Sequence, residues 1–408
     1  MATIRLETVL NKHLEALERT GRLKGAETVI TGIIAAGDGK GPRYLLKGHG
    51  DRPFLRMNSN NYLGLALHTT VKAAEEEAVR LYGTGPGAVR FISGTWEPHV
   101  ALERGLAAFH DRPAAMLFSS AYATVMGTLP PLITDRTAVI SDELNHNSII
   151  NAIALGRPAE KRIYRHLDMG ELERHLTEAA GTCARAIIVT DGVFSMRGVH
   201  APLERIRAIV DRFDAAFAEN ALLIVDDSHG VGALGPRGRG TEEVTHPGAA
   251  DLLIATLGKA LGVNGGYVVG GDAVVRFLRE TSPFYIFSNP ITPAEAASGL
   301  AALGTVDGPD GRALLAHLHA MTHRFRSGLA SLGLETLAGE HPVVPLMVRD
   351  TERTSHIVRH LRDAGILATG LNYPVVPRGD EEIRFQISAD HTVADIDEAL
   401  VALRHLPR

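Results

Sequence analysis

Short apolar runs alternate with helix-like segments through the middle of the chain. Five such runs are found, at 114–118, 137–140, 186–189, 222–225 and 252–255. None of them alternates between apolar and polar positions, as a half-exposed strand would. Continuous apolar strands separated by helices are typical of a mostly parallel sheet that is covered on both faces. The pattern therefore predicts an α/β fold with a mostly parallel sheet.

Helical periodicity and turn residues predict the elements around this sheet. Helices are expected at 3–23, 68–82, 99–110, 123–129, 148–155 and 203–217. A short strand over 43–47 lies between two glycine-rich turns and predicts a hairpin-like arm. In the last third, strands are expected at 343–348, 366–368 and 383–388, and helices from about 294 and at 312–333, 351–364 and 393–405. We therefore expect an N-terminal helix and arm over 1–57, a large domain over 58–300 and a smaller α+β domain over 301–408.

Polar or ionisable residues follow four successive strands of the predicted sheet. They are His146 after one strand, Asp191 and Ser195 after the next, then Asp226 and His229, and finally Thr256 and Lys259. Ligands of parallel sheets bind beyond the carboxyl ends of the strands. Polar residues at four successive strand ends therefore predict a functional site at this edge of the sheet.

Lys259 is the centre of the predicted site. It follows a buried strand inside the segment 251–266, and burial disfavours its charged form and lowers its pKa. A neutral amine can form a Schiff base with a carbonyl group. Asp226 ends the neighbouring strand, and a buried carboxylate needs a positive partner, for which the protonated ring nitrogen of a pyridine cofactor is suitable. A lone aspartate would more simply cap a turn, but the presence of Lys259 favours the cofactor.

Three further positions are ambiguous when read from the residues alone. His229 is either packed or bonded to a cofactor oxygen, and His146 offers a flat ring for stacking. The two histidines are far apart in the sequence and no cysteine joins them, so a metal site is not expected. Arg384 forms either a surface ion pair or a clamp on a substrate carboxylate.

Two segments suggest contacts to an anion or a carbonyl group. The strand over 114–118 leads through Ser119 into a helix that begins near Ala121 and Tyr122, which is the arrangement of a helix N-terminal anion site. The amide-rich stretch 58–65, which includes Asn60, is either a set of turns or one edge of an active site.

Composition excludes several classes of partner. The 408 residues carry a net charge of −5 with Lys and Arg dispersed, so neither nucleic acid nor an anionic membrane is an expected partner. Cys183 is the single cysteine and lies in a surface-like stretch, where we expect it to be inert. Without a secretory signal pattern, the expected location is the cytoplasm.

Seven motifs together resemble the α-oxoamine synthases, pyridoxal-phosphate enzymes with the fold of aspartate aminotransferase. The matching stretches are 60–65 (Asn-Asn-Tyr-Leu-Gly-Leu), 89–95, 141–150, 191–196, 225–230 (Val-Asp-Asp-Ser-His-Gly), 255–262 (Ala-Thr-Leu-Gly-Lys-Ala-Leu-Gly) and 287–289. Within this family, 373–379 and 383–392 are most similar to the glycine C-acetyltransferase branch. The resemblance implies a fold type I enzyme with pyridoxal 5′-phosphate as its cofactor.

The resemblance also implies a role for each residue of the site. Lys259 would hold the cofactor covalently and move protons, Asp226 would pair with the ring nitrogen, and His229 would bond the phenolic oxygen. His146 would stack on the ring, with Ser195 near its polar edge. The phosphate would be held by Thr256 and the backbone at Ala121 and Tyr122, and by Ser288 and Asn289 of a second subunit, so a homodimer is implied. Asn60 and Arg384 would bind the amino acid substrate.

The implied reaction joins an amino acid, in the first place glycine, to an acyl-CoA such as acetyl-CoA, with release of CoA and, in some members, of CO₂. The alternatives are an 8-amino-7-oxononanoate synthase-like reaction with alanine, a longer or unusual acyl group, and a transaminase or decarboxylase on the same fold. A catalytically silent regulatory subunit would lack the lysine, whereas Lys259 is present. The stretches 83–98 and 284–293 depart from the glycine branch, so the acyl group stays open.

Overall fold

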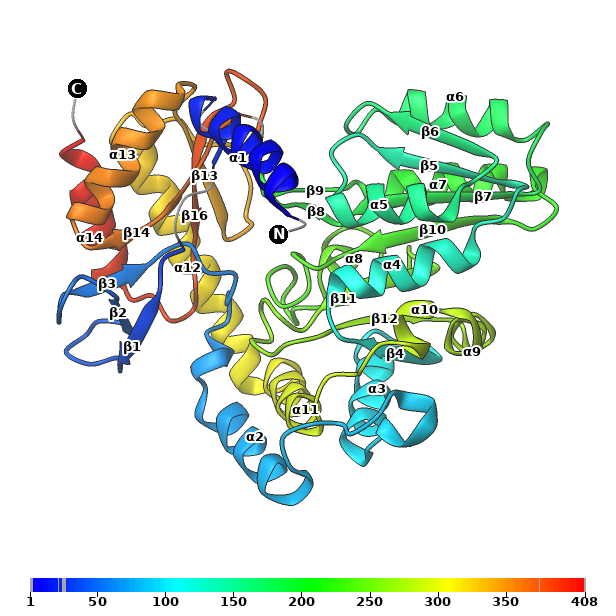
Figure 1. Ribbon diagram of the computed structural model, residues 1–408, viewed down its shortest axis with the longest axis horizontal. Coiled ribbons are helices and arrows are strands. Elements are labelled where there is room, and N and C mark those ends of the chain that lie inside the picture. Colours follow the sequence, from blue (N-terminus) through cyan, green and yellow to red (C-terminus); the bar gives the residue numbers. More distant parts are fainter. Residues whose placement is uncertain (1–2, 21, 24–26, 374, 407–408) are drawn as a thin grey trace.

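A computed structural model describes residues 3–20, 22–23, 27–373 and 375–406 (Figure 1). Pro374, in one of the stretches that resemble the glycine branch, and residue 21, inside the helix expected over 3–23, lie outside the described residues.

A seven-stranded sheet forms the centre of the large part of the molecule. Its strand order is β4-β12-β11-β10-β7-β5-β6. The strands are β4 (Ala114–Phe118), β5 (Thr137–Asp142), β6 (Glu160–Tyr164), β7 (Arg185–Asp191), β10 (Ala221–Asp226), β11 (Leu252–Thr256) and β12 (Gly266–Gly270). Strand β12 runs antiparallel to both of its neighbours, β11 and β4, and the other six strands all run in one direction. The predicted mostly parallel sheet is therefore confirmed.

Two strands of this sheet were not expected from the sequence. Strand β12 is fully buried but begins and ends in glycine, which weakens its strand signal. Strand β6 lies at the sheet edge, where Glu160 and Arg162 are only partly buried and Lys161 is exposed. A charged edge strand protects the sheet from further pairing but carries no continuous apolar run.

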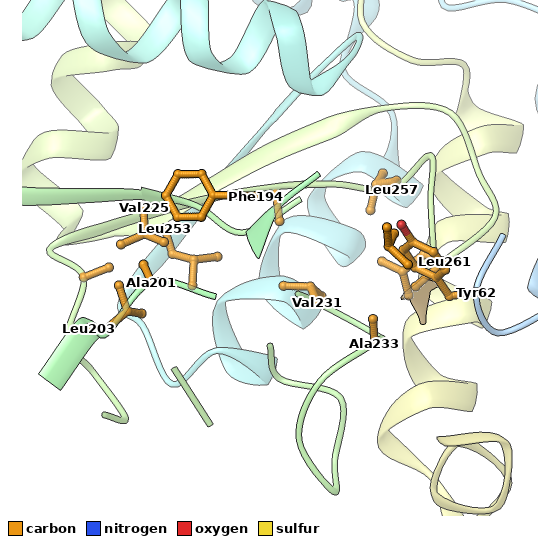
Figure 2. Packing of buried hydrophobic residues seen from close by; sticks show 14 of the residues in the cluster. Tyr62, Phe194, Ala201, Leu203, Val225, Val231, Ala233, Leu253, Leu257 and Leu261 are labelled. Atoms are coloured by element: carbon orange, nitrogen blue, oxygen red, sulfur yellow. The ribbon is translucent and has the colours of Figure 1, made fainter. Parts of the chain in front are cut away.

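Helices cover both faces of the sheet, as Figure 1 shows, and they divide the core into two layers. One face is covered by α4 (Ala121–Leu132), α5 (Asn147–Gly156), α9 (Asp272–Thr281) and α10 (Pro283–Ile286). The other is covered by α3 (Glu97–Phe109), α6 (Met169–Ala179) and α7 (Leu203–Phe213). Figure 2 shows the second layer around Val225 and Leu253, which pair across β10 and β11.

The C-terminal region forms a second group of elements beside this sheet (Figure 1). Its strands are β13 (Val343–Met347), β14 (Ile366–Leu367), β15 (Thr369–Leu371) and β16 (Glu382–Gln386). Its helices are α12 (Pro309–Ser331), α13 (Thr351–Asp363) and α14 (Val393–Arg404). The strands β13, β16 and β15 form an antiparallel sheet in that order.

The remaining elements connect or flank these two groups. They are α1 (Ile4–Arg19), β1 (Ile30–Ile34), β2 (Arg43–Leu46), β3 (Pro53–Arg56), α2 (Thr69–Tyr82), β8 (Val193–Phe194), β9 (Val199–His200), α8 (Thr241–Val244) and α11 (Pro293–Asp307). The predicted hairpin-like arm is β1–β2, and β3 extends it. Strand β3 also pairs in parallel with β14, so the arm and the C-terminal region share one sheet. The domain boundaries at 57 and 300 stay a prediction.

Cys183 is buried, whereas Gly181 and Thr182 beside it are exposed, so the stretch lies at the surface while the thiol itself is covered. Burial raises the pKa of its thiol, which favours the unreactive protonated form. None of the described helices is both long enough and apolar enough to cross a membrane.

Candidate functional site

The carboxyl ends of β5, β7, β10 and β11 meet at one edge of the sheet and form a cavity. Its lining includes Lys259, Asp226, His229, His146 and Ser195, together with Ala121 and Tyr122 at the start of α4. Seven of the residues selected from the sequence therefore lie around one cavity. They come together because parallel strands deliver their carboxyl ends to the same edge.

Lys259 is partly buried and stands in the loop between β11 and β12. Burial lowers its pKa to about 8, and the charges of Asp226 and Asp191 oppose this shift. The amine is therefore still mostly charged near physiological pH, but a minor fraction is neutral, far more than for an ordinary lysine, and this is the form that attacks a carbonyl carbon.

Asp226 is 7% exposed at the end of β10. Its Oδ1 accepts hydrogen bonds from the Ser228 backbone at 3.1 Å and from the Ser228 hydroxyl at 2.5 Å. These bonds orient the carboxylate without neutralising it. A cationic ring nitrogen in the cavity would supply the missing positive charge.

His229 is held from two sides. Its Nδ1 lies 2.7 Å from the hydroxyl of Tyr62, and its backbone carbonyl lies 2.8 Å from Nε2 of His341. Burial raises the pKa of Tyr62, so this hydroxyl keeps its proton; Nδ1 of His229 is its nearer acceptor, and the Asn60 side-chain oxygen at 3.3 Å is the other. Burial also lowers the pKa of His229 well below its ordinary value, and the charges of Lys259 and Arg384 add to the effect. The neutral ring then carries its own proton on Nε2, ready to donate to a cofactor oxygen.

His146 caps the N-terminus of α5 and presents its ring to the cavity. Its Nδ1 bonds the side chain of Ser148 at 2.8 Å, and its backbone N–H donates to Asp191 at 3.2 Å. Burial raises the pKa of Asp191 well above its ordinary value, and the charge of Asp226 adds to this rise. Because the buried Asp191 accepts the hydrogen bond from the His146 backbone, it holds the loop that carries His146 in place.

The N-terminus of α4 lines the cavity and has the geometry in which a helix can hold an anion. Ser120 caps the helix by accepting a bond from the Ala123 N–H. The first N–H groups of the helix have no partner inside it and face outward, where a phosphate can accept from them. Gly266 of β12 packs so closely that a Cβ there would lie 2.4 Å from the Ala121 nitrogen. The strand thus fixes the helix end in place.

Asn60 and Arg384 lie together beside the cavity. The Asn60 side-chain oxygen accepts from Arg384 Nη2 at 3.4 Å and also from Gln386. Asn60 lines a second pocket that reaches Lys259. The C-terminal sheet, through β16, therefore carries an arginine to the edge of the site.

Three predicted phosphate contacts do not line the cavity. The Thr256 hydroxyl donates to the Gly265 carbonyl at 3.1 Å and accepts from the Gly258 N–H at 3.0 Å, so here it shapes the lysine loop. Ser288 and Asn289 lie between α10 and α11, outside the lining of this chain's cavity. All three roles stay predictions.

Several residues that hold the site received no role from the sequence. They are Tyr62, Asn145, Ser228 and His341. Asn145, for example, accepts from the Asp191 N–H at 2.8 Å and donates to the Val189 carbonyl at 2.8 Å, which joins the ends of β5 and β7. Tyr62, Asn145 and Ser228 lie inside motifs already noted, whereas nothing local marks His341.

The arrangement fits pyridoxal 5′-phosphate on four counts: a partly neutral lysine, a buried carboxylate, a neutral histidine donor and a helix N-terminus. No cluster of three or more potential metal ligands exists among the residues that the structure describes.

Comparisons with known proteins agree with this fit. The model of the family described as aminotransferase class I and II matches residues 52–403. An 8-amino-7-oxononanoate synthase of Geobacter sulfurreducens is 40% identical over 394 residues, covering 96% of each chain. The human mitochondrial 2-amino-3-ketobutyrate coenzyme A ligase is 38% identical and covers 100% of this chain and 93% of its own. A serine palmitoyltransferase structure from Sphingomonas wittichii superposes with a TM-score of 0.87 at 24% identity, covering 99% of this chain and 97% of its own.

Proposed function

Because the chain belongs to the class I and II aminotransferase family, as a pyridoxal-phosphate enzyme of the α-oxoamine synthase kind, we propose that it condenses glycine with an acyl-CoA such as acetyl-CoA. The observation that carries this proposal is the single cavity that holds Lys259, Asp226 and His229, with Arg384 at its edge.

Each residue has a task that follows from its surroundings. Lys259 Nζ takes the proton from the amino acid's α-carbon, because its pKa of about 8 lets it act as a base. With pyridoxal phosphate bound, Asp226 would stabilise positive charge on the ring nitrogen, and His229 would donate to the phenolic oxygen. Arg384 binds the substrate carboxylate and so orients the α-carbon toward Lys259.

When bound, pyridoxal phosphate supplies an aldehyde for the amino group and a ring that accepts electrons from the α-carbon. The α-carbon then forms a bond to the thioester carbonyl carbon while the carbon–sulfur bond breaks. The proton removed by Lys259 leaves with the thiol, so one amino acid and one acyl-CoA give a 2-amino-3-keto acid and free CoA. Loss of CO₂ from this β-keto acid, with one proton taken up at the α-carbon in its place, would give an aminoketone, and in the glycine reaction the keto acid is proposed to leave before this step.

The comparison with two relatives favours glycine over alanine as the proposed amino acid substrate. The human ligase aligns over the whole chain, and the motifs at 373–379 and 383–392 favour its glycine branch. The Geobacter synthase has slightly higher identity, which keeps the alanine-dependent reaction as a second candidate. A transaminase on the same fold is the third.

The active enzyme is proposed to be a cytoplasmic homodimer with shared sites. Phe287 is 80% exposed beside Ser288 and Asn289, an unusual position for a large apolar side chain in a monomer. A second copy covering this segment would bury Phe287. It would also bring Ser288 and Asn289 to the partner's phosphate.

The direct test mixes the purified holoenzyme with glycine or alanine and with a panel of acyl-CoAs, and measures free thiol. Glycine with acetyl-CoA is expected to release CoA fastest. Release with alanine and a long dicarboxylic acyl group would instead support the second candidate. Absence of thiol release with every pair would overturn the acyltransferase proposal.

A further inference from the structure

A second pocket opens beside Lys259 and contains an arginine that the proposed reaction does not use. The pocket has a volume of about 430 Å³, and its lining includes Arg56, Asn58, Ser59, Asn61, Ile33 and Lys259. It lies next to the reacting amine but is distinct from the cavity that fits the cofactor.

Arg56 ends β3 and is partly buried. Its guanidinium lies 5.2 Å from the ring centroid of Tyr44 and forms no ion pair with any residue that the structure describes. Arg43 on the neighbouring strand differs, because it pairs with Asp395 at 2.7 Å and with Glu398 at 3.0 Å. Arg56 is therefore a cation positioned against Tyr44 that has no carboxylate partner in the part of the chain that the structure describes.

The acidic residue of the adjoining pocket forms no ion pair with Arg56 among the residues that the structure describes. Asp390 lines the adjoining pocket together with Arg56 and Tyr44. Burial raises the pKa of Asp390. Burial likewise raises the pKa of Tyr44, while the charge of Arg56 opposes that rise.

The other walls of the pocket suit a chain that ends in an anion. Asn58, Ser59 and Asn61 offer hydrogen-bond donors close to Arg56, and an anion prefers such donors around an arginine fork. Ile33 is 49% exposed and supplies an apolar wall for methylene groups. A ligand in this pocket can contact both Lys259 and Arg56, because both residues line it.

We propose that Arg56 binds an anionic group of the acyl donor, either a carboxylate at the far end of the acyl chain or a phosphate of its thiol carrier. This inference rests on the proposed acyl transfer. It makes Arg56 a residue that selects the acyl donor rather than one that takes part in bond formation.

The test compares kcat/KM of the wild-type holoenzyme and the Arg56→Gln variant on four thioesters. Glutaryl-CoA carries a carboxylate at the end of its acyl chain, which butanoyl-CoA lacks. Acetyl-CoA carries the phosphates of CoA, which acetyl-N-acetylcysteamine lacks. Loss of a charge-assisted bond predicts a fall of about tenfold or more for the donor that carries the recognised anion. A fall confined to glutaryl-CoA assigns the carboxylate, and an equal fall for all CoA esters but not for the cysteamine ester assigns the phosphate.

Two further variants keep the test decisive. Arg52→Gln removes a cation that precedes the same strand but lies outside the pocket, and it is expected to match the wild type. Arg56→Lys keeps the charge without the planar fork and is expected to recover part of the loss. Equal kinetics of wild type and Arg56→Gln on every ester, or equal losses on all four, would overturn the inference. Absence of thiol release by the wild type itself would overturn the proposed reaction, and the inference with it.

Discussion

The amine of Lys259 works under two opposing influences, burial and the surrounding carboxylates. Burial lowers its pKa to about 8, and Asp226 opposes the shift. Covalent capture of the cofactor aldehyde by apoenzyme is therefore expected to accelerate as pH rises through about 8, because the neutral amine is the reactive form. Stopped-flow absorbance across pH 6–10 measures this midpoint.

Removing the carboxylate that opposes the shift provides the control. In Asp226→Asn the midpoint is expected to move below that of the wild type, since a charge that raises the Lys259 pKa is lost. A midpoint that stayed near 10.5, the ordinary lysine value, in the wild type would show that Lys259 is not desolvated.

Replacement of the lysine tests its covalent role. Lys259→Ala is expected to carry no cofactor mass after borohydride reduction and to lose about 10²–10⁴-fold in kcat, the range typical of a positioned acid–base group. The matched control is Lys161→Ala, because Lys161 is exposed on β6. Retention of the reduced adduct in Lys259→Ala would rule out this lysine as the attachment point.

Among the elements, β12 determines where α4 begins, and the start of α4 is the predicted phosphate site. A Cβ at Gly266 would lie 2.4 Å from the Ala121 nitrogen, so Gly266→Ala must displace the start of α4. We expect the dissociation constant for pyridoxal phosphate to rise by about tenfold or more, since displaced N–H groups no longer meet the phosphate. Gly271→Ala serves as the control, because no atom lies within 4 Å of a Cβ there. Equal cofactor affinities of the two variants would contradict this role of β12.

The turn after β10 depends on a second buried aspartate. Asp227 accepts from the Thr241 N–H at 2.7 Å and from its hydroxyl at 2.6 Å. Asp227→Ala leaves buried donors without partners and is expected to lower the free energy of unfolding by about 1–3 kcal/mol. Urea denaturation measures the change, and an unaltered midpoint would show that the turn does not need these bonds.

The pH dependence of Asp227 has a defined sign. Burial raises its pKa to about 7 from 3.8, so the folded state holds a proton more tightly than the unfolded chain. Its contribution to stability is present below pH 3.8 and is lost as pH rises through about 7.

For the secondary-structure elements, the sequence predicted most of the strands of the central sheet and part of the site. The apolar runs identified β4, β5, β7, β10 and β11, and residues after each of them line the cavity. Strand β12 was not predicted from the sequence because it begins and ends in glycine. The glycine at its start, Gly266, permits the close approach of the strand to α4. The Tyr62–His229 and Asn60–Gln386 bonds could not be predicted, because they join positions 167 and 326 residues apart.

For the whole molecule, the proposed homodimer predicts that each site includes residues from the other subunit. Lys259→Ala and a double variant of Ser288→Ala and Asn289→Ala are each expected to be impaired. Random heterodimers of the two, formed by co-expression, rebuild one intact site in half of the dimers, so activity should return to about a quarter of the wild type. Light scattering verifies the dimer mass, and mixtures no more active than the parents would contradict shared sites.

The central claim is that this chain forms a carbon–carbon bond between an amino acid and an acyl group. The most direct measurement incubates the holoenzyme with glycine labelled with ¹³C at the α-carbon and with acetyl-CoA, and identifies the product by mass spectrometry. The account predicts an aminoketone or 2-amino-3-keto acid that contains both the labelled carbon and the acetyl group, in step with thiol release. Labelled glyoxylate without thiol release would instead identify amino-group transfer and contradict the account.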